Sequence, residues 1–345
     1  MENRITFFTK FTIFTLGILY LLIAAGSIVR STGIGMGCPD WPKCFGYLVP
    51  PTDISTLTFI EGRAFEKGQM VIKNDTLWVA TKATVASNDI DRKIWIKYPK
   101  HDYSQFNVRH TWTEYVNRLI GAFTGLLVFG MFLLAIKYKK NNLIFTTFLI
   151  VIFTGFQAWL GAKVVASNLA PLKITTHMVM AFVILLLVVF VLFNLKKESK
   201  HLLIIQERKL AKLALGLFVF TFVQMMVGTQ VRQDIDQFSH EFSNQSRQTW
   251  VDSLGVLFMG HKNMALILTI ATFWLLKKMK EAGLNVRFPF NALLFITIAE
   301  FCVGLGLNFL GLPWFLQPVH LVLAGMVLSI QFYLVLLSRS AIKSN

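Results

Sequence analysis

Eight long apolar stretches run through this chain of 345 residues, and they limit its fold more than any other feature. A helix needs roughly 20 mostly apolar residues to cross the hydrocarbon core of a bilayer. Because lipid offers the backbone no hydrogen-bond partner, stretches of this length cross as α-helices. We therefore expect an all-α membrane protein with eight transmembrane helices. They are expected near residues 11–29, 115–136, 143–165, 174–195, 211–231, 259–276, 289–311 and 316–337.

The basic residues indicate how these helices are oriented. Lys and Arg gather after the second, fourth and sixth stretches, and basic loops stay on the cytoplasmic side of a membrane. We expect a multi-pass protein of the inner (cytoplasmic) membrane with both termini cytoplasmic. The first stretch continues to Arg30 without a small-residue cleavage site, so we interpret it as a retained helix rather than a signal peptide. The basic clusters are Lys137, Lys139 and Lys140; Lys196, Lys197, Lys200, Arg208, Lys209 and Lys212; and Lys277, Lys278, Lys280 and Arg287.

The composition favours lipid over nucleic acid as the partner of these basic residues. The chain is 54% hydrophobic and its mean hydropathy is +0.57. Much of the formal net charge of +16 lies in the clusters beside the membrane, where it meets anionic lipid. We therefore expect the lipid bilayer as a partner and no nucleic acid.

The first four stretches resemble the last four. The first ends in Gly26-Ser-Ile-Val-Arg30 and the fifth contains Gly228-Thr-Gln-Val-Arg232, while His177 and His320 occupy the same place in the fourth and eighth. Such a repeat indicates two pseudo-symmetric four-helix bundles, which we assign to residues 1–200 and 201–345. Further matches pair Gly161 with Gly304, Gln157 with Glu300, and Asn117-Arg118 with His261-Lys262.

The two halves of the repeat differ mainly in the first outer loop, which carries a long insertion at about residues 50–109. Residues 69–73, 76–80 and 93–97 alternate between apolar and polar side chains, so we expect an extracytoplasmic loop with short β-strands. The segment before it holds Cys38 and Cys44, and an oxidising outer compartment permits a disulfide between them. Cys302 lies inside the seventh stretch, and we interpret it as a buried small apolar residue.

Three histidines are the first candidates for chemistry, because ionisable groups inside a membrane are costly and usually functional. His177, His261 and His320 all lie near the outer starts of even-numbered stretches. A heme between helices takes axial nitrogens from facing helices, and His261 and His320 meet that requirement. A lone histidine more often bonds to a neighbouring helix, and zinc would favour further ligands that we do not find nearby.

In the first half the position that matches His261 is Asn117, whose neutral amide is a poor iron ligand. Glu114 lies three residues and His110 seven residues before Asn117, so all three fall near one helix face if the helix begins early enough. Glu114 is then placed to move protons or position water during an oxidation. The alternative role for Glu114 is an acid that stabilises the helix N-terminus.

Four cations lie at outer helix ends, where they would pair with heme propionates. Lysine and arginine also reach from helix ends to the membrane interface without binding anything, so both readings stay open. These cations are Arg30, Arg118, Arg232 and Lys262.

The run from Gly26 to Cys44, with Gly-Met-Gly-Cys38-Pro-Asp-Trp-Pro-Lys-Cys44 at its end, resembles the first-loop signature of heme A synthases. The run Glu114-Tyr-Val-Asn-Arg118-Leu-Ile-Gly121 resembles their second-helix motif. The resemblance continues through His177, His261 and His320, and it leaves out the insertion between about residues 53 and 108. Many members of this family have histidine where this chain has Asn117.

The resemblance implies an eight-helix oxidoreductase that converts heme O to heme A by oxidising the C8 methyl group to a formyl group. It implies a heme b cofactor whose iron is held by His261 and His320, and a substrate heme near His177 and Glu114. It also implies a disulfide between Cys38 and Cys44. A heme O synthase and an electron acceptor are the expected partners, and assembly into a homo-oligomer stays open.

Two other classes of protein compete with this interpretation. A cytochrome b-like electron carrier would be expected to hold two well-ligated hemes, whereas Asn117 leaves one obvious bis-histidine site, so a carrier with a single heme stays open. A transporter would need a polar site near the membrane midplane. Glu300 is the one acid deep in a stretch, and we expect it to bond to a neighbouring helix rather than to form a proton pathway.

Overall fold

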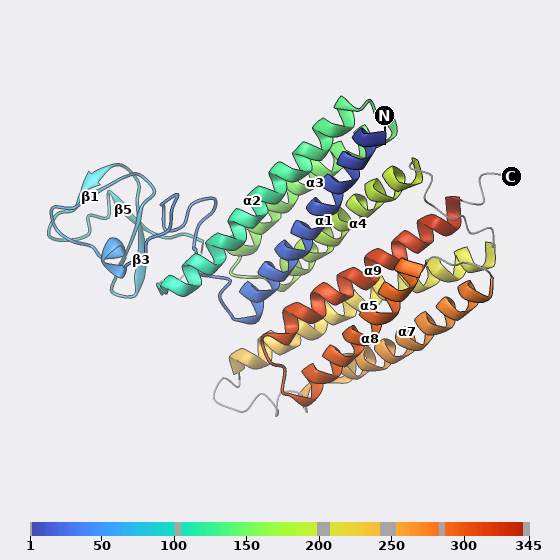
Figure 1. Ribbon diagram of the computed structural model, residues 1–345. Coiled ribbons are helices and arrows are strands. Elements are labelled where there is room, and N and C mark those ends of the chain that lie inside the picture. The colour runs from blue at the N-terminus through green and yellow to red at the C-terminus, as the bar shows by residue number, and fades with distance from the viewer. Residues whose placement is uncertain (1, 101–104, 199–207, 242–252, 283–286, 341–345) are drawn as a thin grey trace. The chain divides into compact units, whose positions relative to one another are not determined.

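The structure, a computed structural model, describes residues 2–100, 105–198, 208–241, 253–282 and 287–340. Within these residues, eight helices are long and apolar enough to cross a membrane, which confirms the predicted all-α membrane fold (Figure 1). The helices are α1 (Glu2–Ser31), α2 (Val108–Lys137), α3 (Asn141–Ala166), α4 (Pro171–Glu198), α5 (Arg208–Glu241), α7 (Val256–Glu281), α8 (Arg287–Phe309) and α9 (Leu316–Ser340).

Large apolar side chains on the outside of these helices indicate that lipid surrounds them. Leu126, Phe145 and Phe295 are 70%, 67% and 73% exposed, a pattern that water would penalise and hydrocarbon favours. Cys302 is exposed in the same way on α8, so the prediction that it is buried in the protein is wrong. The chain is a multi-pass membrane protein.

Helix α5 extends ten residues past its predicted end near residue 231. The helix was predicted to end there because the apolar run stops. In the structure it continues, and Arg232 and Asp236, which lie one turn apart, form an ion pair of 2.8 Å. Such i,i+4 pairs stabilise a helix in its polar part. The helix therefore continues beyond the segment that the bilayer requires.

The chain divides into two compact units. The first contains Met1–Ile28, Thr124–Thr154 and Met180–Asn345, and the second contains Val29–Phe123 and Gly155–Val179. These units have other boundaries than the two functional halves assigned to residues 1–200 and 201–345, and that assignment stays a prediction.

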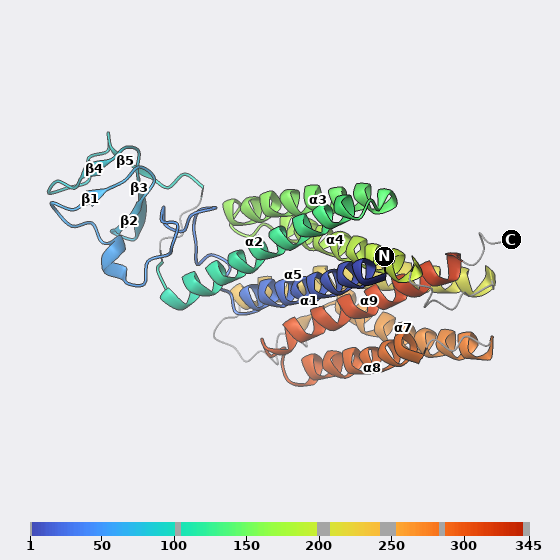
Figure 2. The same ribbon diagram turned by 45° about the horizontal axis from the view of Figure 1, so that its top comes forward.

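In the first unit the last four helices form a closed bundle. Helix α5 packs against α7 and α9, and α8 packs against α7 and α9, as both views show (Figures 1 and 2). Its apolar core includes Leu268, Met279, Leu293 and Leu334, all of which are buried. Helix α1 joins α9 through the Tyr20 hydroxyl, which donates to the Ser329 hydroxyl at 2.8 Å.

The second unit contains the insertion, which forms two small antiparallel sheets. One sheet has the order β2–β3–β5, and the other pairs β1 with β4. The strands are β1 (Ala64–Phe65), β2 (Met70–Lys73), β3 (Thr76–Ala80), β4 (Thr84–Val85) and β5 (Trp95–Lys97). The predicted strands near residues 69–73, 76–80 and 93–97 are confirmed, and β1 and β4 were not predicted.

A two-residue turn joins β2 to β3. Asn74 and Asp75 have φ of 51° and 52°, the left-handed values that this hairpin turn requires and that Asn and Asp tolerate. The turn sets the register, which places Lys73 opposite Thr76 and Met70 opposite Val79.

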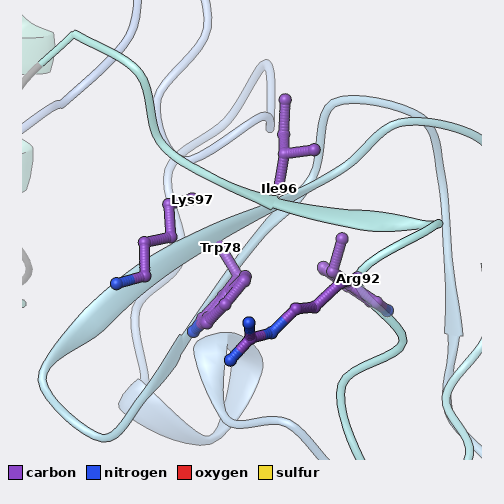
Figure 3. A pocket seen from close by; sticks show the side chains of 5 residues that line it. Trp78, Arg92, Ile96 and Lys97 are labelled. Carbon is purple, nitrogen blue, oxygen red and sulfur yellow. The ribbon is translucent and has the colours of Figure 1, made fainter.

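Figure 3 shows a hollow of about 300 Å³ on this sheet. It is lined by Trp78, Arg92, Trp95, Ile96 and Lys97, and the Lys97 ammonium lies 6.0 Å from the centre of the Trp78 ring. None of the residues predicted to carry chemistry lines it.

We expect Trp95→Ala to destabilise the insertion by about 3–5 kcal/mol, because it removes a large buried ring. Trp95 is 2% exposed and packs edge-on against Phe59 and Phe65. Limited proteolysis of the detergent-solubilised protein should cut the insertion faster in this variant. Its control is Ile96→Ala, since Ile96 is 45% exposed on the same strand. Equal cleavage of both variants would contradict this packing.

Candidate functional site

The structure brings together His261 on α7 and His320 on α9. Their ring centres lie 6.4 Å apart and their planes cross at 79°. Helices α7 and α9 supply one imidazole each, as the sequence predicted for facing helices. Both rings are half-buried in the bundle.

The separation of the two rings fits a shared heme iron. An iron atom that binds one imidazole nitrogen on each side at about 2 Å, with each ring centre roughly 1 Å behind its nitrogen, holds the ring centres roughly 6 Å apart. Among the described residues no three His, Cys, Asp or Glu side chains come together as a metal site. A heme needs only two protein ligands, because the porphyrin supplies the other four nitrogens.

A glycine faces each of the two histidine rings. A Cβ atom added to Gly228 would lie 3.0 Å from Cε1 of His261, and one added to Gly304 would lie 3.4 Å from Cε1 of His320. A larger residue at Gly228 would push the ring aside. The sequence repeat identified both glycines, and the structure gives them this steric role.

Two polar side chains hold the histidine segments in place. Oε1 of Glu300 on α8 lies 3.1 Å from Nδ1 of His320 on α9, so Glu300 contacts a neighbouring helix as predicted, but Nδ1 has no hydrogen-bond partner among the described residues. Nε2 of Gln224 on α5 donates to the backbone oxygen of His261 at 2.8 Å. Sequence reasoning missed Gln224, although an amide inside an apolar stretch was a usable signal.

The second unit contains His177, whose surroundings repeat those of His320. A Cβ atom on Gly161 would lie 3.4 Å from Cε1 of His177, the same distance as for Gly304 and His320. Nε2 of Gln157 donates to the backbone oxygen of His177 at 2.9 Å. The repeat therefore extends from the sequence to the packing of the rings.

Helix α2 begins at Val108, early enough to include His110, Glu114 and Asn117. The Oδ1 atom of Asn117 is buried and has no hydrogen-bond partner in the described part of the chain. An amide oxygen in that state is available to a ligand.

Glu114 and Arg118 clamp the cysteine loop onto α2. The Glu114 carboxylate accepts from the backbone N–H of Cys38 at 3.0 Å and forms an ion pair of 2.5 Å with Arg118. The guanidinium also donates to the backbone oxygens of Asp40 at 2.8 Å and Lys43 at 2.9 Å. The side chains of Arg118 and Glu114 are 13% and 5% exposed, so an unpaired charge on either one would destabilise the fold.

Cys38 and Cys44 form a disulfide, as predicted. The Thr111 hydroxyl donates to the backbone oxygen of Gly37 at 2.8 Å and adds a second attachment of the loop to α2. These contacts give Glu114 and Arg118 a structural role that the sequence did not predict, because backbone acceptors leave no sequence signal.

Two titratable groups beside the loop are shifted by burial. Burial raises the pKa of the Asp40 carboxyl above its usual range, against the opposing effect of the Gly46 N–H, which donates to it at 2.9 Å. Burial also raises the pKa of Tyr98 to about 12, and its hydroxyl donates to the Pro39 backbone oxygen at 2.7 Å. Tyr98 therefore stays a donor to the loop at neutral pH.

The other predicted cations lie at helix ends. Arg232 pairs with Asp236, and Arg30 lies in the last turn of α1. Nζ of Lys262 lies 3.4 Å from Oδ1 of Asn308 and 4.6 Å from the centre of the Phe258 ring. Their pairing with heme propionates stays a prediction.

A known protein family matches the part of the chain that contains both candidate sites. The COX15-CtaA family, described as cytochrome oxidase assembly protein, matches residues 9–67 and 67–332. The chain belongs to this family. The matched residues include all the histidines, glycines and carboxylates of the two sites described above, together with Cys38 and Cys44.

Several proteins named heme A synthase are similar to this chain. The protein from Exiguobacterium sp. is 23% identical over 97% of this chain and 93% of its own length. That from Flavobacterium psychrophilum is 22% identical over 92% of this chain and 93% of its own length. That from Shewanella oneidensis is 22% identical over 70% of this chain and 62% of its own length.

We expect Arg118→Gln to loosen the cysteine loop, because it leaves the buried Glu114 carboxylate without its cation. Breaking a buried pair in this way costs about 3–5 kcal/mol. The disulfide should then be reduced faster by dithiothreitol, as measured by maleimide labelling of the released thiols. Arg109→Gln removes an exposed arginine from the same helix and serves as the control. Equal reduction rates in the two variants would contradict the clamp.

Proposed function

We propose that this protein is a heme A synthase, which oxidises the C8 methyl group of heme O to a formyl group. The family match over most of the chain and the relatives named heme A synthase support this function. The protein is an oxidoreductase of heme A biosynthesis, heme O is its substrate, and the membrane is its setting.

The paired histidines of the last four helices are the observation that carries the proposal. Their ring separation of 6.4 Å matches the spacing of two axial ligands, and Gly228 and Gly304 leave room beside the rings. We assign the heme b cofactor to this pair, with Arg232 and Lys262 toward its propionates. When bound there, a heme b supplies one-electron redox chemistry.

The substrate heme is assigned to the site around His177. This site offers one imidazole, and Asn117 replaces the histidine that would complete a strong pair. A cofactor that stays bound benefits from two strong ligands, whereas a substrate must enter and leave. Arg30 and Arg118 are assigned to this side of the protein, together with Glu114.

Oxidising a methyl group to a formyl group takes one oxygen atom from water and releases the electrons and protons of two successive two-electron oxidations. The electrons must leave the site, so we propose an electron acceptor as a partner. Glu114, a buried acid on α2, is the carboxylate that we assign to accept these protons. A heme O synthase is the partner that would deliver the substrate.

The orientation follows from the basic loops. We place the chain in the inner membrane with both termini cytoplasmic and the insertion outside. The disulfide between Cys38 and Cys44 suits an oxidising outer compartment.

A cytochrome b-like electron carrier is the second candidate. The single bis-histidine pair is enough for such a protein. The Glu114 clamp, the second site around His177 and the family favour the synthase.

We expect His261→Ala and His320→Ala each to lose the low-spin b-type spectrum, because each removes one axial nitrogen. The absorption spectrum of the purified, dithionite-reduced protein measures this loss. His201→Ala removes a histidine outside the predicted stretches and is the control. A normal spectrum in either His261 or His320 variant would remove that residue from the heme site.

We expect Glu114→Gln to keep the b-type heme but to lower conversion of heme O by about 10²–10⁴-fold, the range of general acid–base catalysis. Glutamine retains an oxygen that accepts from Cys38 but loses the ion pair with Arg118, so a control for the loop attachment is needed. Chromatography of extracted hemes measures the conversion.

Thr111→Val separates the two roles of Glu114, because it weakens the loop attachment and leaves the carboxylate intact. Equal loss of conversion in Thr111→Val and Glu114→Gln would assign the effect to the loop. Normal turnover in Glu114→Gln would exclude proton transfer by Glu114.

A further inference from the structure

We infer that Glu300 is a positioning residue that acts through His320: its carboxylate lies against the Nδ1 side of the His320 ring and lowers the reduction potential of the heme that His320 binds. This inference rests on the proposed heme b site. It adds a residue to which neither the repeat nor the family resemblance assigned a role toward heme.

The contact is direct and lies inside the bundle. Oε1 of Glu300 lies 3.1 Å from Nδ1 of His320, close enough for a strong electrostatic interaction between the carboxylate and the ring. The Glu300 side chain is 19% exposed. In the described part of the chain no lysine or arginine forms an ion pair with Glu300, so His320 is its charged-group partner there.

The internal repeat shows that this contact is not needed to fasten the helices. At the position matching Glu300, Gln157 donates its amide to the backbone oxygen of His177. Gln224 makes the same kind of bond to His261. A carboxylate has no proton to donate to a backbone oxygen, so Glu300 interacts with the imidazole ring instead.

Glu300 also makes the two axial positions unequal. Over the described residues, no carboxylate oxygen lies within 4.0 Å of a ring nitrogen of His261 or His177, whereas one does for His320. Of the three histidines assigned to heme, His320 is thus the one with a carboxylate beside its ring among the described residues. The carboxylate therefore distinguishes His320 from its proposed partner His261 as well as from His177.

The physical effect of this carboxylate has a definite sign. The ferric heme core carries a net positive charge and the ferrous core carries none, so a nearby anion favours the ferric form. A carboxylate beside the ring of a heme ligand therefore lowers the reduction potential of that heme.

The test is Glu300→Gln in the full-length protein, because glutamine keeps the size of the side chain and is the residue of the other half. We expect the variant to keep its low-spin b-type spectrum. Its ratio of reduced to oxidised heme at one fixed ambient potential should rise at least tenfold, which is 59 mV for a one-electron couple. Spectroelectrochemical titration with redox mediators measures the ratio.

Gln224→Leu is the matched control, because it removes the bond to the His261 backbone without changing a charge. It should move the ratio far less. An unchanged ratio in Glu300→Gln, or an equal rise in both variants, would overturn the inference while leaving the heme site intact.

Two further outcomes are also decisive. If the Glu300→Gln variant loses its heme, Glu300→Asp is titrated in its place. The shorter aspartate side chain keeps the negative charge but holds it farther from Nδ1 of His320. An upward shift in that variant supports the inference and an unchanged potential overturns it. Absence of a b-type heme from the unsubstituted protein would refute the proposed cofactor site itself, and this inference with it.

Discussion

A polar group inside a bilayer must find its partner within the protein, and this constraint organises both candidate sites. Glu300 lies against His320, and Gln224 and Gln157 donate to the backbone of the two other histidine segments. In lipid an unpaired group of this kind costs several kcal/mol. His177 and His261 are held through their backbone oxygens, which leaves their rings free for a ligand, whereas Glu300 lies against the ring of His320.

The same constraint explains why the two halves of the repeat have diverged. One half holds two imidazoles 6.4 Å apart, which is the requirement for keeping a heme. The other replaces one imidazole by Asn117 and uses Glu114 and Arg118 to hold the cysteine loop on α2. On the proposed assignment, a common four-helix design would give one tight heme site and one site that suits exchange of its heme.

The fold was predictable because membrane helices are specified by apolar length alone. The eight membrane-spanning helices of the described residues were all predicted, and their ends shifted where polar residues continue a helix, as Arg232 and Asp236 do on α5. The strands β1 and β4 were missed because two residues each carry no periodicity, and only tertiary pairing defines them. Cys302 was misjudged because an apolar residue in a membrane helix faces lipid as readily as protein.

The candidate site was predictable to the extent that the repeat marks it. Comparing the halves identified His177, His261 and His320 together with the glycines and the position of Glu300. It did not identify the clamp, because Arg118 binds backbone oxygens of the loop and these depend on the folded path of the chain. Nor did it show which atom of His320 Glu300 contacts.

The most direct test of the central claim is the heme content of the protein purified from cells that also make heme O. The reduced spectrum is recorded and the extracted hemes are separated by chromatography. We predict heme B together with heme A or a hydroxylated heme O. Heme B alone would contradict the synthase function and favour an electron carrier, and the absence of any heme would contradict the account at its base.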